Sequence, residues 1–130
     1  MKRSTVDWVL GVALVLYVIF NILLTPPAGL ETRNPALVTG IGVVSLALLF
    51  IGLALAIVAI VLVYRRSRRA AGAAIIAASL FVPAFLVEQT GNFSTLRPPP
   101  AIEAIEIVQA ALVVIIVAAG FWRLRRSAST

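Results

Sequence analysis

Five polar side chains have the types and spacing to bind a cation or to move a proton: Glu88, Glu103, Glu106, Gln109 and Asn21. Glu103 and Glu106 are three residues apart and Gln109 follows three residues later, so all three fall on one stripe of a helix. Ionisable residues within apolar helices mark ion or proton sites when they face the interior of a bundle. The pattern therefore predicts a polar cluster in which Asn21 and Glu88 join the glutamates from neighbouring helices.

The alternative interpretation is that both glutamates only decorate the first two turns of a helix, where the helix dipole favours negative charge. Glu106 separates the two interpretations because only 16 uncharged residues lie between it and Arg123. That interval is about 24 Å of helix against a hydrocarbon core of about 30 Å. We therefore expect the Glu106 side chain to lie at the edge of the hydrocarbon and to face protein rather than lipid.

The inventory of reactive groups argues against catalysis. The chain has no cysteine and no histidine, and its one lysine is Lys2. Disulfides, Cys-ligated iron–sulfur clusters, zinc sites built on Cys or His and Ser-His-Asp triads are therefore excluded. Asp7 is the single aspartate, so an aspartyl dyad is excluded too. We predict a protein that is not an enzyme and that has no cofactor and no metal site.

The composition predicts one domain, residues 1–130, embedded in a bilayer. Of its 130 residues 62% are hydrophobic and only 12% are charged, against about 25% charged in an ordinary globular domain. The net charge of +6 could suggest nucleic acid as a partner. However, the basic residues flank apolar runs of membrane length and are not interleaved with aromatic residues, which favours the membrane interpretation and predicts no nucleic acid partner.

The uncharged runs predict an all-α integral membrane protein with a bundle of four transmembrane helices. We expect the spans at about residues 7–25, 36–64, 70–88 and 101–122. The basic start resembles a signal peptide, but its apolar run is longer than the usual ~7–15 residues and lacks an A-x-A site, so we expect an uncleaved first helix. Asn34 and Pro35 predict the cap and first residue of the second helix. Pro83 should kink the third.

Small residues predict where the helices approach one another. Gly52 and Ala56 make a small-xxx-small pair in the second span, and Tyr17 and Ser45 are candidates for hydrogen bonds between helices. Two alanine series have the spacing of a packing seam, four residues in the third span and seven in the fourth. They are Ala70, Ala74 and Ala78, and Ala104, Ala111 and Ala118.

The turn Arg65, Arg66, Ser67, Arg68, Arg69 sets the predicted orientation. Four guanidinium groups cannot enter hydrocarbon without a cost of roughly 3 kcal/mol each, so they must lie in water between two helical hairpins. With this turn in the cytoplasm, nine basic residues lie inside and two outside, which predicts that both termini are cytoplasmic. The arginines are either this topology signal alone or also a contact for anionic lipid, at about 1 kcal/mol per charge.

These observations favour two functions over a third, an enzyme acting on lipid, which would need an acid and base pair that only the glutamates could supply. The first is a non-catalytic accessory subunit that packs against partners in a larger membrane complex, as minimal loops and small-residue helix faces suggest. The second is a small homo-oligomeric transporter or channel that uses Glu88, Glu103 and Glu106 for a cation or proton. The expected partners are membrane lipids and other membrane subunits or copies of the chain. The abundance of arginine and alanine favours a prokaryotic plasma membrane.

Overall fold

A computed structural model of the chain describes residues 5–25, 38–92, 95 and 98–128, with side chains up to residue 125. These residues form helices joined by turns, and within them lie four helices that are long and apolar enough to cross a membrane. The prediction of an all-helical protein with four candidate spans is therefore confirmed. The chain segments at Lys2, Asn34, Pro35 and Arg97 lie outside the described residues.

The first two helices are α1, Thr5–Leu24, and α2, Gly40–Tyr64. The predicted start of the second span near residue 36 is wrong, because Thr39 is extended and caps the helix. Its hydroxyl accepts a hydrogen bond from the Gly42 N–H at 3.0 Å, which satisfies one of the free donors of the first turn. Residues 40–64 still make about 37 Å of helix, longer than the hydrocarbon core.

The third span is divided into α3, Ala70–Ser79, and α4, Phe81–Gln89. Pro83 has no N–H to donate to the Ser79 carbonyl one turn earlier, and α3 ends at Ser79. The predicted interruption by this proline is confirmed. The break between α3 and α4 separates the two halves of one apolar span of 20 residues.

The last helix, α5, runs from Pro100 to Ala128 and is longer than the predicted 101–122. Its final turns carry Arg123 and Arg125, and the candidate membrane span within this helix is Pro100–Arg125. The helix starts at a proline, which is favoured at a first helical position because its missing N–H has no partner there.

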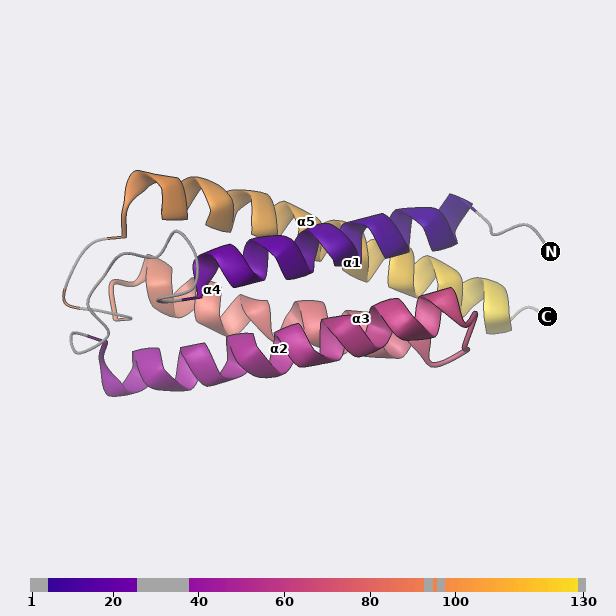
Figure 1. Ribbon diagram of the computed structural model, residues 1–130, viewed down its shortest axis with the longest axis horizontal. Helices are drawn as coiled ribbons and strands as arrows, with labels where there is room; N and C mark the ends of the chain where they lie inside the picture. The colour runs from indigo at the N-terminus through magenta and orange to yellow at the C-terminus, as the bar shows by residue number, and fades with distance from the viewer. Residues whose placement is uncertain (1–4, 26–37, 93–94, 96–97, 129–130) are drawn as a thin grey trace.

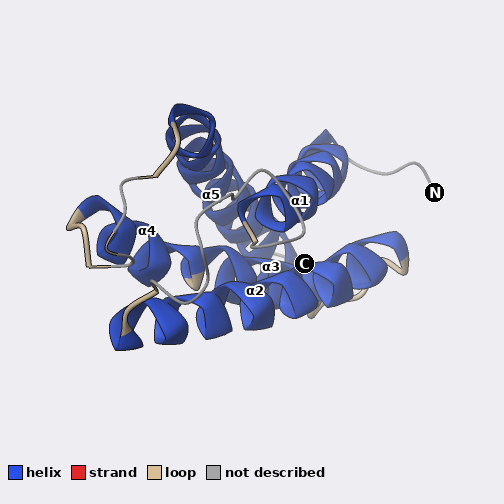
Figure 2. Cartoon of the chain, turned by 60° about the vertical axis from the view of Figure 1, so that its left-hand side comes forward, coloured by secondary structure: helices blue, strands red, loops and turns tan. Residues whose placement is uncertain are grey.

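The four candidate spans lie side by side, with α3 and α4 together forming the third (Figure 1). Around the bundle α1 is followed by α2, then by α3 and α4, and then by α5, which also contacts α1. The start of α1, the turn between α2 and α3 and the end of α5 lie at one end of the molecule (Figure 1), which we call the arginine end. The opposite end, where α4 finishes and α5 starts, is called the carboxylate end. Figure 2 shows the same helices turned by 60°, with α1 beside α5 in both views.

Buried residues on α2 and α5 recur at alternating steps of three and four. On α5 the stripe is Ile102, Glu106, Gln109, Val113, Ile116 and Gly120, and Leu112 is buried beside Val113. On α2 it is Gly42, Ser45, Leu49, Gly52, Ala56, Ala59 and Val63. This mean spacing of 3.5 residues is that of helices packed with a left-handed supercoil.

The predicted seam of Ala104, Ala111 and Ala118 is wrong, because all three alanines are exposed. Alanine is tolerated equally against lipid and against protein, whereas Gln109 cannot face lipid cheaply and fixes the other face of α5 as the interior. Ala70, Ala74 and Ala78 are buried as predicted.

Two glycines permit the closest helix contacts. A Cβ atom at Gly52 would lie 3.2 Å from the Ala77 carbonyl oxygen, and one at Gly120 would lie 2.7 Å from Ile75 Cγ1. The absence of a side chain at these positions therefore brings α2 and α5 against α3.

Candidate functional site

The interior holds a layer of polar side chains from α1, α2 and α5, which we call the buried polar layer. It comprises Tyr17, Asn21, Ser45 and Gln109, each at most 2% exposed. Water cannot reach these groups in a membrane, so each must bond to protein or to something held inside it. Their partners therefore decide what the layer can do.

Three of these side chains donate hydrogen bonds to backbone carbonyls of other helices. Tyr17 Oη donates to the Ala77 carbonyl oxygen of α3 at 3.0 Å. Gln109 Nε2 donates to the Tyr17 carbonyl oxygen of α1 at 3.0 Å. Asn21 Nδ2 donates to the Leu49 carbonyl oxygen of α2 at 3.4 Å. Together these bonds connect α1 with α2, α3 and α5.

The Tyr17 bond crosses the bundle between α1 and α3, which are not neighbours in the cyclic order. It passes beside Gly52, where a Cβ atom would lie 3.4 Å from the tyrosine oxygen. The expectation that Tyr17 bonds between helices is confirmed. For Ser45 it is wrong, since its hydroxyl donates to the Ile41 carbonyl oxygen of its own helix at 3.1 Å, a common choice for serine within a helix.

The amide oxygens of Asn21 and Gln109 are also buried, and within the described part of the chain neither has a hydrogen-bond donor. The two amides lie at the same level of the bundle. Gln109 reaches the Tyr17 carbonyl, which in an α-helix is the acceptor of the Asn21 backbone N–H. Such acceptors are suited to water, a cation or a protonated acid.

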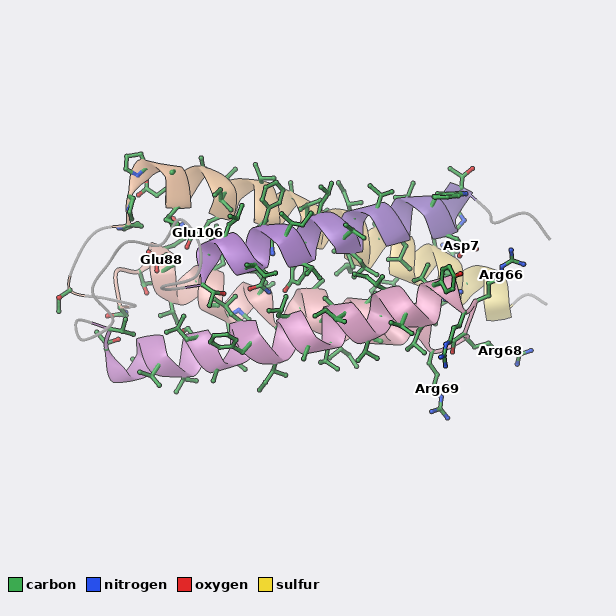
Figure 3. The ribbon with its side chains drawn as sticks, viewed as in Figure 1. Asp7, Arg66, Arg68, Arg69, Glu88 and Glu106 are labelled. Atoms are coloured by element: carbon green, nitrogen blue, oxygen red, sulfur yellow. The ribbon has the colours of Figure 1, made fainter. Side chains whose placement is uncertain are left out.

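The carboxylates divide between the interior and the surface. Glu106 and Glu88 are each 7% exposed, whereas Glu103 is exposed. Figure 3 shows Glu88 and Glu106 at the carboxylate end, far from the labelled arginines. Glu106 thus faces protein, as expected, and it lies one turn before Gln109 on the same buried stripe. The structure brings Gln109, Glu106 and Asn21 into the interior and leaves Glu103 outside it.

The arginine turn is exposed, with Arg65, Arg66, Arg68 and Arg69 all open to solvent. The Arg66 backbone has a left-handed conformation, with φ 57°. Its N–H donates to the Val63 carbonyl oxygen, and the Ser67 N–H donates to the Leu62 carbonyl oxygen. These two bonds form a Schellman motif, whose left-handed position is usually glycine. The same motif closes α4, with Gly91 at φ 77°.

The sequence did not predict an ion pair at the arginine end. Arg123 Nε on α5 lies 2.9 Å from Asp7 Oδ1 on α1, and Arg123 Nη1 donates to the Ser67 carbonyl oxygen at 2.9 Å. One guanidinium group therefore joins α1, α5 and the turn between α2 and α3. We call Asp7, Arg123 and Ser67 the arginine clasp. Its signal was available, since Asp7 is the one acidic residue that the topology places on the basic side.

Comparison of the chain with models of known protein families, with curated protein sequences and with solved structures found no match.

Proposed function

We propose that the chain is a non-catalytic accessory subunit that packs against partners in a larger complex of the plasma membrane. The observation that carries this proposal is the use made of the interior polar groups. Tyr17, Asn21, Gln109 and Arg123 all donate to backbone carbonyls of other segments. Polar side chains committed in this way support a helix scaffold and leave broad apolar outer faces for lipid or other subunits.

Affinity purification in a mild detergent tests this function. A tag after Thr130 should recover the chain together with other membrane proteins in a constant ratio. The control variant Gly52→Leu should lose those partners, because a side chain at this position meets the Ala77 carbonyl and separates α2 from α3. A native chain that purifies alone as a folded monomer would contradict the proposal.

The orientation belongs to the same proposal. We place the arginine end, and with it both termini, in the cytoplasm. In the predicted topology, nine basic residues of the sequence fall on this side and two on the other, the bias that orients multi-pass proteins. Trp8, Tyr64 and Trp122 are exposed at the arginine end, where an aromatic belt at a membrane interface would lie.

The second candidate is a small homo-oligomeric transporter or channel for a proton or cation. Its support is the pair of buried carboxylates, Glu88 and Glu106, together with the amide oxygens of Asn21 and Gln109. Flux into liposomes that is lost in Glu106→Gln and kept in Glu103→Gln would favour this candidate, because Glu103 is exposed on the same helix. Flux through the native protein no greater than that of protein-free liposomes would exclude it.

A further inference from the structure

An apolar groove lies on the outer surface between α1 and α5, near the arginine end. Its volume is about 310 Å³. Val6 and Val9 form one wall and Ile115, Ala118 and Trp122 form the other. Ala118 and Ala119 have small side chains where α5 passes the first turns of α1, and this leaves space for the groove. The arginine clasp joins the same two helices just beyond it, so the walls are held in place.

One exposed arginine follows the α5 wall of the groove at helical spacing. The wall follows Ile115, Ala118 and Trp122, and the next position on this stripe, three residues on, is Arg125. Arg125 is exposed, whereas the neighbouring Arg123 is engaged by Asp7 and Ser67. Trp122 is 62% exposed and is the wall residue nearest to Arg125 in the sequence, a position that suits tryptophan at the level of lipid headgroups.

We propose that this groove binds one acyl chain of an anionic phospholipid, with the lipid phosphate at Arg125. The dry apolar walls fit a hydrocarbon chain, and a guanidinium group binds a phosphate through two parallel hydrogen bonds. From Ile115 to Trp122 the wall is only about 10 Å long, which suits an acyl chain better than a packed helix. The inference is independent of the proposed accessory role.

Lipid binding by the purified protein, measured by native mass spectrometry with phosphatidylglycerol and phosphatidylcholine, tests the site. Ala118→Phe fills the groove and should lower phosphatidylglycerol binding at least fivefold. Ala111→Phe is the matched control, since it is an exposed alanine one heptad earlier on α5, and it should leave binding unchanged. Equal effects of the two variants would overturn the proposal. So would a change in oligomeric mass with Ala118→Phe at constant lipid binding, which would mark a protein interface.

The charge requirement has its own pair of variants. Arg125→Gln should reduce the preference for phosphatidylglycerol over phosphatidylcholine about fivefold, the equivalent of about 1 kcal/mol for one charge near an anionic headgroup. Arg68→Gln removes an exposed arginine of the same end that is not on the groove stripe and should leave the preference intact. Equal losses from both variants would show attraction to the whole arginine end and would overturn the site.

A measurement without a groove variant completes the test. In Trp8→Phe protein the remaining tryptophan is Trp122, beside the groove. Phosphatidylglycerol with brominated acyl chains should quench its fluorescence more strongly than brominated phosphatidylcholine at equal mole fraction. Equal quenching by the two lipids would contradict a selective site.

Discussion

Breaking the arginine clasp should separate the helix ends at one side of the bundle. The Arg123 and Asp7 side chains are 14% and 18% exposed, and their contact is 2.9 Å. Exposed ion pairs contribute about 0.2–1 kcal/mol, whereas hydrogen bonds to charged groups contribute about 1.5–3 kcal/mol. Because Arg123 makes both the ion pair and the bond to Ser67, we expect Arg123→Gln to lower the free energy of unfolding by about 2–4 kcal/mol.

The partner substitution should cost less. Asp7→Asn keeps an oxygen that accepts from Arg123 and loses only the charge, so we expect about 1–2 kcal/mol. The double variant should cost less than the sum of the single variants by about 1 kcal/mol. Titration with SDS in mild detergent, followed by circular dichroism, measures these values. Arg125→Gln is the control, because Arg125 is exposed on the same helix, and should change stability by under about 0.5 kcal/mol. Equal costs for Arg123→Gln and Arg125→Gln, or additive single variants, would refute the clasp.

Four further substitutions test the interior and the turn after α2 by the same unfolding measurement. Gly52→Ala places a Cβ 3.2 Å from the Ala77 carbonyl oxygen and should destabilise by about 1–3 kcal/mol, whereas Gly72→Ala meets nothing within 4 Å and should stabilise; the reverse order would contradict the packing. Arg66→Gly relieves the left-handed conformation of a non-glycine residue and should stabilise by about 1 kcal/mol. Gln109→Leu removes the Nε2 donor together with the Oε1 acceptor, which lacks a described partner, and should lower the free energy of unfolding by under about 1.5 kcal/mol. A much larger loss of stability would indicate that a donor is bound at the Gln109 amide oxygen.

The sequence predicted the number and approximate limits of the apolar helices because charged side chains are costly in hydrocarbon, so that uncharged runs of membrane length mark the spans. The same rule predicted that Glu106 faces protein. The split at Pro83 followed from its missing N–H. These features depend on one residue or one run at a time, and local chemistry was enough to find them.

Features that depend on two distant segments were not predicted. The contact between Asp7 and Arg123 joins residues 116 positions apart, and its formation depends on how α1 and α5 align. The alanine series of α5 pointed to the wrong face of the helix, because alanine spacing alone does not distinguish a surface that faces lipid from one that faces protein, whereas the stripe of Glu106 and Gln109 marked the buried face. The cap at Thr39 was missed since an earlier Asn-Pro pair also has the chemistry of a helix start. For the face of α5 the alanine series and the polar stripe were locally equivalent signals, and the packing of the bundle decided between them.

The central claim is that four helices cross the membrane with the α2–α3 turn on one side and the end of α4 on the other. The chain has no cysteine, so single cysteines can be introduced without background. In sealed vesicles of known orientation, Arg68→Cys should react with an impermeant maleimide only from the cytoplasmic face and Thr90→Cys only from the opposite face; both positions are exposed. Labelling of both cysteines from the same face would contradict the four-span account.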